Sequence, residues 1–184
     1  MRARTLACAL LALQGLGAAC GGSGGEAAAD AGPVFIALDR DFQAYDTWQL
    51  FEFDGESQGR VHPFGTRKVY INKLPSLGAT KFGVGTIIVK EIFDKNPPSH
   101  TVYHAMVKRG GGFNASDGGA KDWEYFEIVR PDGGTPSIDW RGIAPPPGKG
   151  YGAAFGGLCN DCHGLAGAND YVQSPPLQFD GGGY

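Results

Sequence analysis

Hydrophobic and polar positions alternate with a period of two in several stretches of this chain. In residues 84–93, Ile88, Lys90 and Ile92 fall on one predicted face, and the residues between them fall on the other. Alternation over four to eight residues, bounded by Gly and Pro, is typical of a strand with two different faces. The predicted strands are 66–72, 84–93, 101–109 and 122–130.

The rest of the chain predicts few helices. Phe42, Tyr45 and Trp48 recur three residues apart, which predicts a short amphipathic helix over 39–50 with Asp39 as N-cap and an aromatic stripe in the core. The other predicted segments are an irregular crossing at 131–150, a helix at 151–165 and an extended surface tail at 174–184. Short connections between strands imply antiparallel pairing. We therefore predict an α+β fold, an antiparallel β-sheet packed with a few helices.

The N-terminus has the features of an export signal. Arg2 and Arg4 precede an apolar run that is too short to cross a bilayer. Small residues then lead to Cys20, a pattern similar to bacterial lipoprotein cleavage sites. We therefore predict a protein of the periplasm, held at the outer membrane by a lipid on Cys20, with plain secretion as the alternative. The predicted parts are a signal peptide at 1–19, a flexible Gly- and Ala-rich tether at 20–32 and a folded domain at 33–184.

The charge of the chain argues against two classes of partner. The formal net charge is −3, and loss of Arg2 and Arg4 with the signal peptide changes it to −5, since −3 − 2 = −5. Such a chain offers no basic surface for the phosphates of nucleic acid or for anionic lipid head groups. We therefore expect contact with a membrane only through the lipid anchor.

The clearest chemistry lies in the sequence C-N-D-C-H, which runs from Cys159 to His163. This spacing is the attachment signature of haem c, in which two thiols bond to the porphyrin and the following His binds the iron. A structural zinc site would need four ligands, but Cys8 lies in the predicted signal peptide and Cys20 is the predicted lipid anchor. A redox-active dithiol would not need the adjacent His. We therefore predict one haem c bound by Cys159 and Cys162, with His163 as the metal ligand.

The order of several short motifs resembles the cytochrome P-460 family of bacterial c-type haem proteins. The matching pieces cover the chain from about residue 39 to 172. They are TRKVYIN, VGTIIVKEIF, MVKR, DWEYFEIVRPDG, CNDCH and NDYV, in this order. The resemblance implies an antiparallel sheet with helices around it, a haem near the C-terminus and a homodimer.

The resemblance also gives roles to two basic residues. In members that oxidise hydroxylamine, a lysine of the G-T-x-x-V-K-E stretch is covalently bonded to the haem ring, and this position is Lys90. An arginine of the R-x-V-Y stretch lies near the haem pocket, and this position is Arg67. From the residues alone both are ordinary strand charges. Lys90, however, shares its face with Ile88 and Ile92, and a lysine on a covered face needs a partner or a chemical use.

One residue of the family pattern is missing. The hydroxylamine-oxidising members use a distal glutamate for proton transfer, and its expected place falls in the R-G-G-G sequence at 109–112. No Glu lies between Glu91 and Glu124. Proton removal from a bound substrate needs a positioned base, and nothing in the sequence selects one. The candidates are Asp117, Asp122 and His104, although His104 is more simply a sheet histidine on the face of Val102 and Met106.

Three functions follow from these observations. The first is an enzyme that oxidises hydroxylamine towards nitrous oxide or nitric oxide and passes electrons to an external acceptor such as another cytochrome, with Lys90 and Arg67 at its site. The second is a protein similar to cytochromes c′-β that binds nitric oxide or carbon monoxide without turnover. The third is electron transfer, with Met106 or His104 as a second axial ligand. The Lys90 match favours the enzyme, and the missing Glu favours gas binding.

Overall fold

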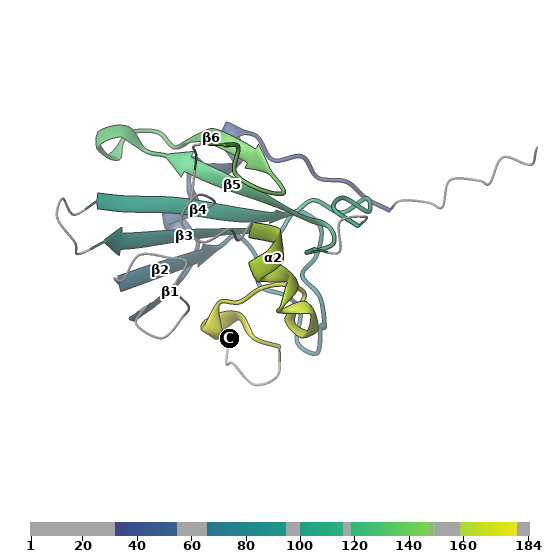
Figure 1. The fold of residues 1–184 in the computed structure, drawn as a ribbon. Coiled ribbons are helices and arrows are strands. Elements are labelled where there is room, and N and C mark those ends of the chain that lie inside the picture. Colours follow the sequence, from purple (N-terminus) through teal and green to yellow (C-terminus); the bar gives the residue numbers. More distant parts are fainter. Residues whose placement is uncertain are drawn as a thin grey trace, which may run out of the picture.

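The structure, a computed structural model, describes residues 32–54, 66–94, 100–115, 119–147, 149 and 159–179. The predicted signal peptide and nearly all of the tether lie outside this part of the chain. The described residues form a six-stranded antiparallel sheet with a few short helices, which agrees with the predicted α+β class (Figure 1). No helix in these segments is long and apolar enough to cross a membrane.

Each strand pairs with the next one along the chain, so the sheet is a simple meander. The four predicted strands are confirmed as β2 to β5. Their period-two alternation identifies them because successive side chains of a strand point to opposite faces of the sheet. The strands are β1 (Gln49–Asp54), β2 (Thr66–Ile71), β3 (Ile87–Asp94), β4 (His100–Lys108), β5 (Trp123–Val129) and β6 (Ser137–Gly142).

The predicted helix over 39–50 is wrong. Two 3₁₀ turns, η1 (Asp39–Phe42) and η2 (Tyr45–Thr47), occupy its first part, and the backbone is extended at Trp48. The residues that follow pair with β2 as strand β1. Their alternation of apolar and polar side chains fits the sheet, and this tertiary pairing outweighs the helical spacing of the aromatic residues.

The side chains of these turns have definite roles. Asp39 is not the N-cap that the sequence predicts. Its carboxylate accepts a hydrogen bond from the backbone N–H of Ile138 at 2.8 Å, which ties the turn to β6. The aromatic stripe packs into the core as predicted, because Phe42 and Tyr45 are fully buried and Trp48 packs against the same cluster.

Two predictions for the C-terminal half need correction. The region 131–150 contains β6, where Trp140 is buried despite the surrounding Pro and Gly. The segment 174–184 is not simply a surface tail, since a 3₁₀ turn, η6 (Pro175–Leu177), places Leu177 fully in the core. In the predicted helix at 151–165, the structure shows α2 (Cys159–Gly164), and residues 151–158 lie outside the described part.

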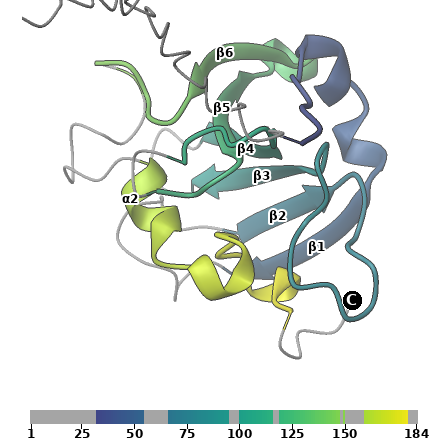
Figure 2. The ribbon, with the colours of Figure 1, turned by 90° about the vertical axis from the view of Figure 1, so that its right-hand side faces the viewer.

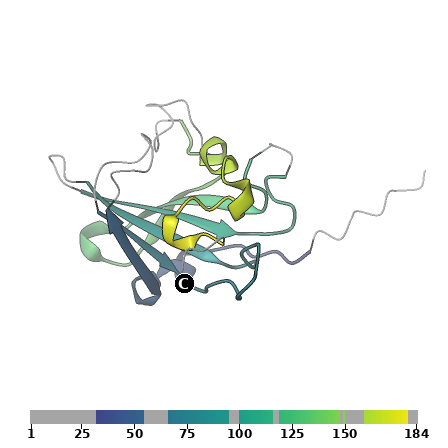
Figure 3. The same ribbon diagram turned by 90° about the horizontal axis from the view of Figure 1, so that it is seen from below.

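The sheet is covered on both faces, with α2 and the C-terminal segment on one side and η1 and η2 on the other (Figures 2 and 3). We call the first the α2 face. Burying one large apolar side chain stabilises a fold by about 1.5–3 kcal/mol, so both faces hold the sheet in place. The buried residues of the α2 face are Val69, Ile71, Phe82, Ile88, Met106, Ala120, Trp123, Tyr125, Trp140, Val172 and Leu177.

Candidate functional site

The C-N-D-C-H motif forms one short helix, α2, that lies on the α2 face of the sheet. Cys159 packs against the core of this face, and both Cys159 and Cys162 are free thiols. Burial raises the pKa of the Cys159 thiol to about 11. A redox-active C-x-x-C pair depends on a lowered thiol pKa, so this environment argues against dithiol chemistry.

Asn160, between the two cysteines, fastens α2 to the loop before β5. Its side-chain oxygen accepts hydrogen bonds from the backbone N–H of Ala120, at 2.9 Å, and from the side chain of Asn114. The Asn160 amide also donates to the Asn114 oxygen at 2.9 Å. Both asparagines are buried, so each bond protects a polar group that could not find water. The motif is therefore held by the hydrogen bonds of this asparagine pair and by the packing of Cys159 against the sheet.

The backbone of Gly119 lies directly against this asparagine pair. A Cβ at this position would come within 2.2 Å of three side-chain atoms of Asn160. We expect Gly119→Ala to lower the free energy of unfolding by about 1–3 kcal/mol, because Asn160 must move and leave buried polar groups unpaired. Gly83→Ala is the matched control, since the nearest atom to its Cβ is 4.0 Å away. Equal denaturant midpoints for the two variants would contradict this role of Asn160.

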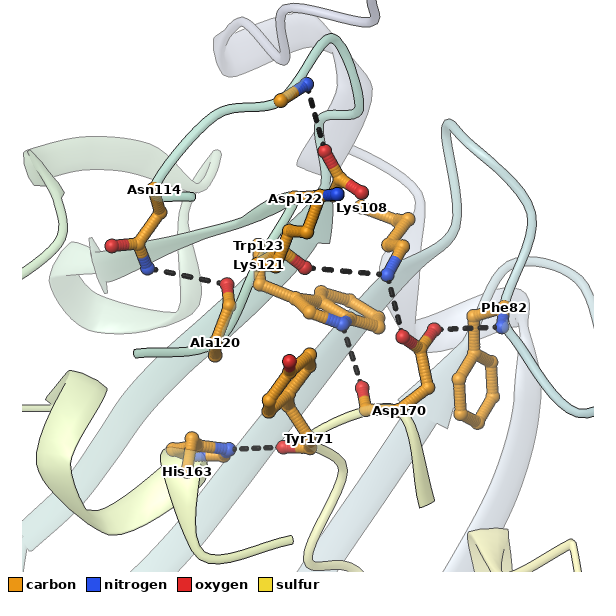
Figure 4. Close-up of polar contacts among 11 residues, drawn as sticks. Phe82, Lys108, Asn114, Ala120, Lys121, Asp122, Trp123, His163, Asp170 and Tyr171 are labelled. Carbon is orange, nitrogen blue, oxygen red and sulfur yellow. Dashed lines mark hydrogen bonds and ion pairs between the residues drawn. The ribbon is translucent and has the colours of Figure 1, made fainter. Parts of the chain in front are cut away.

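His163 has a fixed orientation. Its Nδ1 lies 2.8 Å from the backbone carbonyl oxygen of Tyr171 (Figure 4). Because a carbonyl oxygen only accepts, Nδ1 carries the proton and Nε2 carries the lone pair. Burial lowers the pKa of the imidazole to about 4, so the ring is neutral at pH 7. A neutral imidazole with a bonded Nδ1–H is the form that binds metals through Nε2.

The ring of Tyr125 packs against His163, with ring centroids 5.0 Å apart. The Tyr125 hydroxyl is buried and has no hydrogen-bond partner among the described residues. A buried hydroxyl without a partner is costly, so a polar bound group beside α2 would satisfy it.

A row of cross-strand neighbours runs across the α2 face. The pairing register places Lys90 of β3 beside His104 of β4, and His104 beside Glu127 of β5. Directly paired residues of antiparallel strands point to the same face. We call this set the central row; it consists of Val69, Lys90, His104, Glu127 and Trp140.

Lys90 lies where the sequence predicts, on a covered face between the buried residues Ile88 and Ile92. Burial, together with the positive charge of Arg67, lowers the pKa of Lys90 to about 7. Burial also lowers the pKa of His104 to about 3, with a further contribution from the charge of Lys90. A lysine with this pKa is largely neutral just above pH 7, so it has a nucleophilic amine.

Arg67 also points to this side of the sheet. It is 1% exposed, whereas its sequence alone suggested an ordinary strand charge. It pairs in register with Ile92, which lies two residues along β3 from Lys90 and on the same face. The two basic residues of the family resemblance are therefore neighbours on the α2 face, and the charge of Lys90 also reaches His163, whose pKa it lowers.

Glu127 is the functional candidate that the sequence interpretation missed. Its Oε2 accepts a hydrogen bond from the indole N–H of Trp140 at 2.5 Å, which fixes the carboxylate on this face. The other two glutamates of β3 and β5 serve the opposite face: Glu91 accepts from Tyr45, and Glu124 binds arginines. Alternation within β5, which places residues 123, 125 and 127 on one face, was the available signal.

The other candidate bases have different positions. Asp122 accepts from the backbone N–H of Gly112 at 2.9 Å and lines a separate polar cavity near Lys108. Asp117 lies outside the described residues. His104 does lie on the face of Met106, as predicted.

No family model, curated protein or solved structure matches the chain. The side chains present fit a covalently bound haem on three counts. Two free thiols lie on one turn of α2, the His163 imidazole offers Nε2, and the Tyr125 hydroxyl lacks a partner among the described residues. The residues that would hold the haem are Cys159, Cys162 and His163.

Proposed function

We propose that this chain is a periplasmic c-type haem protein, similar to cytochrome P-460, that oxidises hydroxylamine and passes the electrons to an external acceptor. Haem c would be linked through Cys159 and Cys162, near the C-terminal end of the domain, and its iron bound by Nε2 of His163. The observation that carries the proposal is the hydrogen bond from Nδ1 of His163 to the Tyr171 carbonyl, because it leaves the Nε2 lone pair for iron.

When bound, the haem would supply an iron that can withdraw electrons from a small nitrogenous substrate. The chain supplies the means to remove protons. Glu127 would accept them at Oε1, while Trp140 holds Oε2 and so fixes the carboxylate. Arg67 would place a cationic group on the same face, where it favours a substrate that loses protons.

Lys90 would form a third covalent link to the haem ring, as the lysine of the G-T-x-x-V-K-E stretch does in the hydroxylamine-oxidising members. The new C–N bond would replace a ring C–H bond and an amine N–H bond, with release of two protons and transfer of two electrons to the external acceptor. Lysine is a nucleophile only in its neutral form. With a pKa of about 7, Lys90 has this form available at neutral pH, which an exposed lysine lacks. The half-buried position of Lys90 beside Arg67 therefore supports the link.

The composition of the central row favours an enzyme over a gas-binding protein. A cytochrome c′-β-like protein would have an apolar pocket, whereas this row carries an amine, an imidazole and a carboxylate side by side. Glu127 supplies the base whose absence from 109–112 favoured gas binding. The remaining parts of the proposal rest on the sequence: a lipid anchor at Cys20, a homodimer, and another cytochrome as electron acceptor.

The test is turnover by the mature haem protein. We expect hydroxylamine to reduce an artificial electron acceptor, with nitrous oxide or nitric oxide as product, and a Cys159→Ala/Cys162→Ala double variant to show no reduction. Binding of nitric oxide or carbon monoxide without acceptor reduction would contradict the proposal and establish gas binding instead. A six-coordinate, low-spin spectrum would contradict it in favour of electron transfer, with His104 or Met106 as ligand.

A further inference from the structure

We infer that Lys108 and Asp170 are positioning residues for the proposed axial histidine. Their buried ion pair fixes the backbone corner whose carbonyl, that of Tyr171, holds the Nδ1 proton of His163. The inference rests on the proposed haem site, and it assigns the tuning of the iron ligand to two residues outside the Cys159–His163 motif.

The ion pair between Lys108 and Asp170 is buried and well supported. Nζ of Lys108 in β4 lies 2.7 Å from Oδ1 of Asp170, and the two side chains are 6% and 3% exposed (Figure 4). The other carboxylate oxygen, Oδ2, accepts from the backbone N–H of Phe82 at 2.9 Å. The indole N–H of Trp123 donates to the backbone carbonyl of Asp170 at 2.7 Å. Three separate elements therefore hold Asp170 against the sheet.

The backbone from Asp170 to the Tyr171 carbonyl forms a sharp corner. Asp170 and Tyr171 have consecutive positive φ angles of 48° and 68°, although neither is glycine. Such angles are unfavourable for residues with a Cβ, and they persist where surrounding contacts enforce them. The contacts of Asp170 supply that enforcement. The corner directs the Tyr171 carbonyl at His163 instead of into the solvent.

The hydrogen bond from Nδ1 affects how strongly His163 binds a metal. The strength of the bond from Nδ1–H sets how much electron density Nε2 gives to a metal. A shorter, better aligned bond makes the imidazole a stronger donor and favours ferric iron over ferrous iron. A corner that relaxes would weaken the bond and reverse this preference.

The position of the pair argues for more than stability. Replacing a buried ion pair by apolar residues is often neutral or stabilising, so burial alone does not explain its presence. The pair borders a polar cavity of about 270 Å³, which gives a substituted side chain room to rearrange. Besides the pair, its lining includes Tyr171.

The test uses the haem-loaded full chain and the variants Lys108→Met, Asp170→Asn and Lys108→Arg. Asp170→Asn keeps the acceptor for the Phe82 N–H and removes the charge, whereas Lys108→Arg keeps the charge. The readouts are haem content, reduction potential and the iron–histidine stretching frequency of the ferrous protein. The control is Lys149→Met, because Lys149 forms an ion pair with Asp139 of the same length, 2.7 Å, at the exposed surface.

We expect Lys108→Met and Asp170→Asn to keep their haem, to shift the reduction potential to more positive values and to lower the stretching frequency. In Lys108→Arg, the reduction potential and the stretching frequency should stay closer to the wild-type values. Lys149→Met should change neither. Unchanged values in Lys108→Met and Asp170→Asn would overturn the inference, as would loss of folding in both, which indicates a purely structural pair. If the wild-type chain itself carries no haem, the proposed function fails first, so the two failures are distinguishable.

Discussion

The Glu127→Gln variant should keep its haem and lose hydroxylamine oxidation by about 10²–10⁴-fold, the usual contribution of a positioned base. Glutamine preserves the size of the side chain and its bond to Trp140, but it cannot take up a proton. The loss should appear in kcat, since the reacting position on the iron remains open. Steady-state kinetics with an artificial acceptor measures it.

Two further variants make this result specific. Glu52→Gln changes an exposed glutamate on the opposite face of the sheet and should leave the rate unchanged. Trp140→Phe removes the donor that fixes Glu127 and should give a smaller loss than Glu127→Gln. Activity of Glu127→Gln within about twofold of the wild type would show that the proton acceptor lies elsewhere, since a working base contributes at least ~10²-fold.

The Lys90→Met variant should carry haem on the two cysteines and lack the third link. Its ferrous Soret band should move back towards that of an ordinary five-coordinate haem c, and its hydroxylamine turnover should fall. Lys68→Met is the matched control, because Lys68 lies in the same sheet opposite Glu91 in the register of β2 and β3, on the face away from α2. An unchanged Soret band in Lys90→Met would show that Lys90 is an unlinked structural lysine.

The pH dependence of link formation gives a second test of Lys90. Burial lowers the pKa of Lys90 from 10.5 to about 7, so the neutral amine is the minor form below pH 7 and the major form above it. We therefore expect the yield of the third link to rise with pH through about 7. A yield that rises only near pH 10 would instead indicate an exposed lysine with its ordinary pKa.

Much of the sheet follows from the sequence, because alternation identifies β2 to β5 directly. The errors arise where two patterns compete. Phe42, Tyr45 and Trp48 have helical spacing, but their segment forms 3₁₀ turns, and the following residues gain more by pairing as β1. β6 is short and flanked by Pro and Gly, which obscures the alternation around Trp140.

The candidate site was predictable only in part. The motif residues and Lys90 follow from spacing and from the family resemblance. Glu127 was missed because the family pattern directed attention to 109–112, and because its face depends on the register of β5 beside an irregularity at Glu127/Ile128. The Tyr171 carbonyl is a backbone group, and its direction depends on a corner held by residues more than sixty positions away in the chain, so no local pattern indicates it.

The central claim is that one haem is bound through the Cys159–His163 motif, with Lys90 as a third attachment point. The most direct measurement is peptide mass mapping of the mature protein, produced in a host that exports and matures c-type cytochromes. We predict haem on the peptide containing Cys159 and Cys162, joined to the peptide that contains Lys90. A haem-free Cys159–Cys162 peptide in exported, folded protein would contradict the account.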